Sequence, residues 1–295
     1  MLKIEQLAEL VERNRPAIQA RVREFSIGDK FFAFNSRPAI MGVVNLSPDS
    51  WYRESVCLSA DRAIQRGNVL SAQGADIVDI GAESTLAQAS LASATDQMKK
   101  LMPVVSGLSA GKVLVSIETY ESAVALAGLE AGARVINFTG MKPSEAMLAE
   151  IAAREAALII CYVQGENVRA VGDFDFGKDP VAMMEEFFAG MIERATRLGV
   201  DRIILDPGLG FYYRNLQDSV VRIRHQMNIF LNTFRLRRLG CPICHALPHA
   251  FEFFGEEVRC AEPFFAVLAS LGKTDLFRTH EVPRIKAVIE TLAAF

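Results

Sequence analysis

Polar side chains in this 295-residue sequence stand at the ends of short apolar runs, and the carboxyl ends of parallel strands meet on one side of a sheet. Arg278 and His280 stand two residues apart at the end of the last run, so both can point the same way. Two cations that converge with an amide such as Asn45 make an anion site, and a phosphorylated substrate fits it. In the alternative reading, Arg278 pairs with a carboxylate of its own domain.

A second candidate is Asp206, which ends an apolar run and precedes a sharp turn, Pro207-Gly208-Leu209-Gly210. The glycines of that turn let a ligand approach the backbone, and a carboxylate there needs hydrogen-bond donors. A heterocycle with adjacent N–H groups would supply two. Three of the four histidines, including His249, fall near two neighbouring run ends, which predicts a concave, polar-lined pocket. Further polar groups at such ends are Asp79, Glu83, Thr85, Glu118, Thr119 and Asn137.

Short apolar runs alternate with longer segments of helical period, and this alternation predicts the elements that position the polar groups. Runs that are apolar on both faces are typical of strands in a covered parallel sheet. The intervening segments, such as 181–199, carry apolar residues at three- and four-residue spacing and end in glycine. Eight such units follow one another without a linker, which favours one closed (β/α)8 TIM barrel of the α/β class. The expected strands are 39–44, 76–80, 112–117, 134–138, 158–163, 202–206, 242–246 and 275–279.

Residues 1–25 stand outside this pattern, and we divide the chain into an N-terminal helical extension with its lead-in, 1–37, and a barrel, 38–295. An apolar stripe of Ile4, Leu7, Leu10 and Val11 predicts a helix. We expect that helix to pack on the bottom or flank of the barrel; the alternative is a contact in an oligomer, such as a homodimer.

The net charge of −3, with acids and bases interspersed, favours neither nucleic acid nor an anionic membrane as a partner. A small molecule is the better expectation. No apolar run approaches the roughly 20 residues that cross a bilayer. The N-terminal stretch carries acids where a signal peptide needs an apolar centre. These features predict a cytoplasmic protein with reduced cysteines.

The run Cys241-Pro-Ile-Cys244-His245 matches the spacing of c-type haem attachment, and with His249 it also matches a zinc cluster. However, 241–246 reads as a short buried strand, in which Cys241 and Cys244 would point to opposite faces. We therefore interpret both cysteines as small hydrophobic residues.

Two segments carry a family resemblance. Residues 41–50 (MGVVNLSPDS) resemble the first signature of dihydropteroate synthases, a family of pterin-binding barrels, and residues 74–85 (GADIVDIGAEST) resemble the second. Residues 116–119, 135–137, 205–211 and 278–280 resemble later segments in the right order. The resemblance covers roughly residues 38–295.

This resemblance implies a transferase that joins a pterin methyl diphosphate to an arylamine, p-aminobenzoate or another, and releases diphosphate with the help of Mg2+. It implies that Asn45, Arg278 and His280 hold the diphosphate and that Asn45 also touches the metal. The residues implied at the pterin are Glu118, Asn137, Asp206 and His249, with Asp79 beneath the pocket; those implied at the arylamine are Thr85, Phe211 and Leu247.

The sequence also departs from the family pattern. Glu118 stands where the family has Asp, and Leu247-Pro248-His249 stands where the family has Ser-Arg-Lys. Leu86-Ala87-Gln88 replaces Arg-Pro-Gly. These changes remove groups that contact the acceptor, so we expect a divergent member. Two other functions remain as alternatives: a non-catalytic pterin- or phosphate-binding paralogue, and the pterin domain of a methyltransferase, which Arg278 and His280 disfavour.

Overall fold

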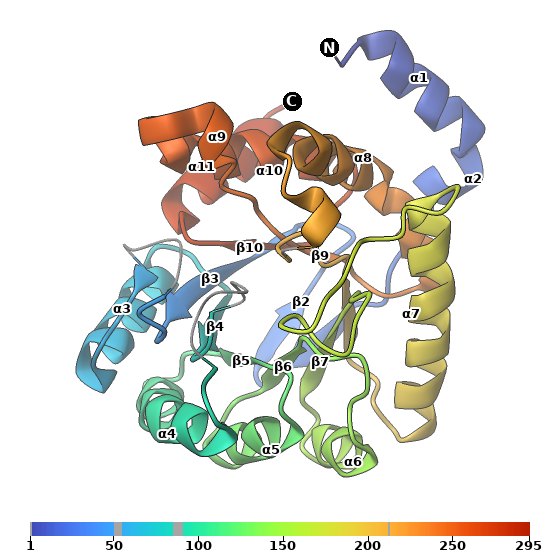
Figure 1. Ribbon diagram of the computed structural model, residues 1–295. Coiled ribbons are helices and arrows are strands. Elements are labelled where there is room, and N and C mark those ends of the chain that lie inside the picture. Colours follow the sequence, from blue (N-terminus) through green and yellow to red (C-terminus); the bar gives the residue numbers. More distant parts are fainter. Residues whose placement is uncertain (1, 50–54, 85–90, 212) are drawn as a thin grey trace.

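In a computed structural model of the protein, eight parallel strands form a barrel surrounded by helices (Figure 1). The structure describes residues 2–49, 55–84, 91–211 and 213–295. The sheet order is β8-β7-β6-β5-β4-β3-β10-β9, and a parallel bridge between Leu205 and Ile243 joins its two edges. The predicted (β/α)8 barrel is therefore confirmed. The strands are β3 (Ala39–Asn45), β4 (Ile77–Gly81), β5 (Val115–Thr119), β6 (Val135–Phe138), β7 (Ala157–Cys161), β8 (Ile203–Asp206), β9 (Cys244–Ala246) and β10 (Leu276–Thr279).

Helices follow each strand and cover the outside of the barrel, with side-chain caps that explain several of their starts. Ser59, Ser93, Ser144, Asp179 and Asp218 each accept a hydrogen bond from a backbone N–H of the first turn. The helices are α3 (Ala60–Ala72), α4 (Ala94–Ala110), α5 (Ser122–Glu130), α6 (Glu145–Ala153), α7 (Pro180–Arg197), α8 (Ser219–Leu236), α9 (Phe251–Phe254), α10 (Ala261–Leu271) and α11 (Val282–Ala293); short 3-10 turns are η2 (Arg214–Leu216), η3 (Arg237–Leu239) and η4 (Gly255–Cys260).

All eight expected strands are present, but β5 and β9 begin two or more residues later than predicted. β5 starts at Val115 rather than at 112, because Lys112 adopts a left-handed conformation (φ 60°) in the turn after α4. β9 starts at Cys244, and Cys241 precedes it, so the alternation argument for these two cysteines was wrong in detail. Cys244 and His245 are fully buried, and His245 Nε2 lies 2.7 Å from Thr233 Oγ1. Burial lowers the pKa of His245 to about 3, which suits a neutral core residue.

The lead-in before the barrel contains a β-hairpin that the sequence did not reveal. β1 (Phe25–Ile27) and β2 (Lys30–Phe32) pair antiparallel across a turn in which Gly28 has φ +57°. Ile27 and Phe32 pack against inward residues of the barrel strands, including Met41 and Ile204. The hairpin thus closes the barrel interior on the side opposite to the strand ends described below, and residues 1–37 are only partly helical.

Helix α1 (Ile4–Arg13) projects from the barrel (Figure 1). It buries no residue, and Ile4 is 77% exposed, so the expectation that this helix packs on the barrel was wrong. The following short helix α2 (Arg15–Ile18) buries Ala17 and lies against α8. A homodimer through α1 stays a prediction. Within the described part of the chain, no helix combines the length and apolarity that crossing a bilayer requires.

A buried ion pair fastens the lead-in to the barrel. Arg237, after α8, pairs with Asp275, before β10, and also donates to the carbonyl of Ala20 (3.3 Å) and to Asn35 Oδ1 (3.0 Å). Asp275 is fully buried and accepts from the backbone N–H of Ile243 (2.8 Å). One guanidinium therefore connects three distant segments.

We predict that Arg237→Met lowers the free energy of unfolding by about 3–5 kcal/mol, because it leaves the buried Asp275 without its counter-ion. Arg238→Met is the matched control, since Arg238 is half-exposed and pairs with Glu185 at the surface. It should cost about 1 kcal/mol or less. Urea unfolding of both variants measures the difference; equal losses would show that the Arg237 pair does not stabilise the fold.

Candidate active site

A cavity of about 440 Å3 opens at the carboxyl ends of the barrel strands. Its size suits a small organic ligand. Eight of the ten predicted site residues line it: Asn45, Glu118, Asp206, Phe211, Leu247, His249, Arg278 and His280. Asn137 is fully buried outside this lining, and the prediction for Thr85 falls outside the described residues.

Arg278 and a group of carboxylates form the floor of the cavity. Arg278 Nε lies 2.9 Å from Asp79 Oδ2, and its Nη2 donates to Glu118 Oε2. Asn137 Nδ2 also donates to Asp79 Oδ2, at 3.0 Å. The contacts of Arg278 thus match the alternative reading, in which it pairs with carboxylates of its own barrel, although it also lines the cavity. Burial alone would lower the pKa of Arg278, but Glu118 and Asp79 raise it, so the guanidinium stays charged.

Asp206 lies at the end of β8, and the turn that follows holds it in place. Its Oδ1 accepts from the backbone N–H of Gly208 at 2.8 Å. Gly208 has φ +73°, and a Cβ there would lie 2.2 Å from the carbonyl oxygen of Tyr162, so no other residue fits without a backbone shift. Burial raises the pKa of Asp206, while the Gly208 N–H and Arg278 oppose that rise.

Glu118 is the group of the floor whose charge is most finely balanced. It is the penultimate residue of β5 and lies between Gly81 of β4 and Asn137 of β6. Burial raises its pKa to about 7; Arg278 opposes the rise, and the nearby Asp79 and Asp206 add to it. Near neutral pH, the floor can therefore either hold or release one proton.

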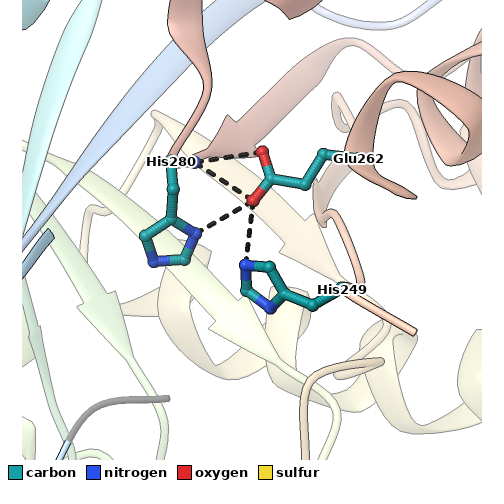
Figure 2. A group of neighbouring side chains, drawn as sticks. All are labelled: His249, Glu262 and His280. Carbon is teal, nitrogen blue, oxygen red and sulfur yellow. Dashed lines mark hydrogen bonds and ion pairs between the residues drawn. The ribbon is translucent and has the colours of Figure 1, made fainter. Parts of the chain in front are cut away.

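The wall beside this floor carries both cavity histidines and a buried carboxylate (Figure 2). His280 Nδ1 lies 2.9 Å and His249 Nε2 lies 3.2 Å from Glu262 Oε1. His280 Nε2 lies 3.4 Å from Asn45 Nδ2, and the same Nδ2 donates to Ser55 Oγ at 2.6 Å. The predicted neighbours Asn45 and His280 are thus brought together, and His249 joins them rather than the carboxylate floor.

Glu262 is a site residue that sequence reasoning missed. It is fully buried in the first turn of α10, within an otherwise apolar segment, AEPFFAVLASL. A single acid in such an apolar helix was the sequence feature that could have indicated this residue. Although burial favours the neutral acid, hydrogen bonds from His249 and His280 bring the pKa of Glu262 below its usual range.

Apolar side chains also line the cavity. Leu209, Phe211 and Leu247 are buried there. Two polar residues of α8 were not anticipated. Arg222 Nη2 donates to Glu252 Oε1 (2.5 Å), and Gln226 Nε2 donates to the carbonyl of Leu209 (2.9 Å). Gln226 Oε1 is buried and has no hydrogen-bond partner within the described part of the chain, so this wall can offer a ligand an acceptor.

We predict that the stability of Glu118→Gln, measured relative to the parent protein at the same pH, increases as the pH rises. The pKa of Glu118 is raised from 4.5 to about 7 in the folded state. The contribution of the protonated Glu118 side chain to the free energy of unfolding is therefore complete below about pH 4.5 and is lost as the pH rises through about 7. Glutamine cannot ionise, so thermal unfolding at pH 5 and pH 8 should show the variant gaining up to about 3 kcal/mol relative to the parent. Glu252→Gln, at the exposed mouth, should show no such gain. The same pH dependence in the Glu118 variant and the parent would contradict the assignment.

A family model described as "pterin binding enzyme" matches residues 41–244. The chain is 27% identical over 280 residues to a dihydropteroate synthase of Synechocystis, covering 91% of this chain and 93% of that protein. It is 28% identical over 276 residues to a probable bifunctional folylpolyglutamate synthase/dihydropteroate synthase of Haloferax volcanii. That match covers 90% of this chain but only 32% of the bifunctional protein.

Solved structures agree with the fold. Dihydropteroate synthase of Xanthomonas albilineans with 4-aminobenzoic acid has a TM-score of 0.76 at 24% identity, over 92% of this chain and 97% of that one. The Yersinia pestis dihydropteroate synthase in a sulfonamide drug complex has a TM-score of 0.77 at 22% identity, over 92% and 98%. The resemblance predicted from residues 41–50 and 74–85 is thus confirmed, and the chain belongs to the family of pterin-binding enzymes, with dihydropteroate synthases among its relatives.

Proposed function

We propose that this protein is a dihydropteroate synthase-like transferase, which joins the methylene carbon of a pterin methyl diphosphate to the nitrogen of an arylamine. In this reaction the C–O bond to diphosphate breaks, a C–N bond forms, and the amine loses a proton. The observation that carries the proposal is that a single cavity presents carboxylates, an imidazole–amide pair and an apolar wall to the same ligand. Each of these parts matches one part of the two substrates.

The carboxylate floor suits the pterin. The amino group and the ring N–H groups of a pterin are adjacent donors, and the carboxylates of Asp206 and Glu118 are fixed acceptors in the same cavity. Asp79 and Asn137 support the floor from beneath, since Asn137 is bonded to Asp79 rather than exposed to the cavity. A pterin that donates to Glu118 would favour the ionised carboxylate.

The leaving diphosphate belongs beside Asn45, His280 and Arg278. His280 and Asn45 are in contact, and Arg278 carries five N–H donors, so it can bind a phosphate oxygen while it holds Glu118. Cationic and N–H groups at this position stabilise the charge that develops as diphosphate leaves.

Mg2+ fits this arrangement through Asn45, whose amide oxygen is the kind of ligand this ion prefers. Asn45 is half-buried at the end of β3 and lines the cavity, and Mg2+ usually takes one or two protein oxygens together with substrate phosphates and water. When bound, the ion would offset charge on the diphosphate. His280 and Arg278 act on the same charge from the protein side.

We predict that Asp206→Ala weakens pterin binding about 10- to 150-fold, because a charge-assisted hydrogen-bonded pair is worth about 1.5–3 kcal/mol. Calorimetric titration with the pterin alone measures this loss. Glu252→Ala, at the cavity mouth, serves as the control and should bind like the parent. Unchanged affinity in Asp206→Ala would rule out the floor as the pterin site.

A further prediction concerns the arylamine. An acceptor carboxylate entering beside Leu247 and Pro248 loses solvation without gaining a hydrogen bond, and Arg222 is already engaged by Glu252. We therefore expect p-aminobenzoate to react more slowly than arylamines without a carboxylate, by a penalty of about 1–3 kcal/mol, and sulfonamides to inhibit weakly. Product formation across a panel of arylamines measures this. Fast turnover of p-aminobenzoate, blocked by low sulfonamide concentrations, would contradict it.

A further inference from the structure

Three side chains from three segments converge on one point of the cavity wall. His249 follows β9, Glu262 lies in the first turn of α10, and His280 follows β10 (Figure 2). One nitrogen or oxygen atom from each lies within 4.8 Å of the other two. The two closest separations, 2.9 Å and 3.2 Å, join the imidazole nitrogens to the same carboxylate oxygen, Glu262 Oε1.

We propose that His249, Glu262 and His280 form a binding site for a divalent transition-metal ion such as Zn2+. Bonds of about 2.0–2.2 Å to two imidazole nitrogens and one carboxylate oxygen place these atoms about 3.0–3.5 Å apart around such an ion. Two of the separations already lie near this range, so a small rotation of the imidazoles completes the set. Imidazole ligands favour Zn2+, Fe2+ or Co2+, whereas Mg2+ prefers oxygen ligands, so this site differs from one at Asn45.

The carboxylate is held in place before any ion binds. Glu262 Oε2 accepts from the Thr279 hydroxyl and from the backbone N–H groups of His280 (3.1 Å) and Glu281 (3.3 Å). These bonds fix the carboxylate so that Oε1 faces the two imidazoles. Hydrogen bonds of this kind orient ligand carboxylates in metal sites.

The site would be open to ligands. His249 and His280 both line the cavity, while Glu262 is fully buried behind them. Three protein ligands leave at least one coordination position, and it faces the cavity rather than the protein interior. With one carboxylate and two neutral imidazoles, a divalent ion gives the wall a net positive charge. A small anion would bind there; if the proposed transferase function holds, that anion is the departing diphosphate.

The test is metal binding to the full chain without substrates, so its outcome does not depend on transferase activity. After treatment with a chelator and dialysis, the protein is titrated with Co2+, whose visible spectrum reports a low-coordinate site, and Zn2+ is added in competition. We expect one Co2+ per chain, displaced by Zn2+. His249→Ala and Glu262→Gln should each weaken binding by on the order of 100-fold or more.

Two variants are controls. Glu252→Gln removes a carboxylate at the mouth of the same cavity, and Cys260→Ser removes an exposed thiol; both should bind metal like the parent. Thermal unfolding checks that Glu262→Gln is folded, and His249→Ala gives an independent test if it is not. Absence of stoichiometric binding by the parent, or equal affinity in the parent and His249→Ala, would overturn the proposal.

Discussion

The cavity floor depends on the ion pairs that Arg278 forms with Asp79 and Glu118. Asp79, Glu118 and Asp206 come from three different strands, and burial works against the charge of Glu118 and Asp206. The guanidinium contacts Asp79 and Glu118 directly and lowers the pKa of both Glu118 and Asp206 relative to what burial alone would give. A buried cation with several carboxylate partners is costly to disturb, because removing it leaves uncompensated charge.

The parts of the cavity around this floor carry different kinds of side chain. Acceptors gather at the bottom, and apolar side chains line another part of the cavity. The imidazole and amide groups gather on the wall formed at the ends of β3, β9 and β10. The two walls are built differently. Glu262 fixes the imidazoles through its own buried hydrogen bonds, whereas Phe211 and Leu247 are positioned by packing. The same barrel can therefore accommodate changes in the acceptor while it keeps the proposed pterin and anion sites.

The sequence predicted the barrel well, because eight apolar runs alternating with helical segments permit few other folds. Eight of the ten residues predicted for the site line the cavity, since strand ends converge in a barrel. The sequence did not reveal the β1–β2 hairpin, whose strands are three residues each and show no clear alternation. It also missed two residues on helices: Glu262 of α10, which contacts the cavity histidines from behind, and Gln226 of α8, which lines the cavity. The partners of Arg278 were left open because pairing across strands is not visible in sequence.

A crystal structure of the protein with a pterin methyl diphosphate tests the central claim most directly. The account predicts that the pterin edge contacts Asp206 and Glu118 above an intact Arg278 pair, with diphosphate beside Asn45 and His280. It also predicts that the methylene carbon faces the wall of Phe211 and Leu247. A pterin bound outside this cavity, or a diphosphate placed away from Asn45, His280 and Arg278, would contradict it.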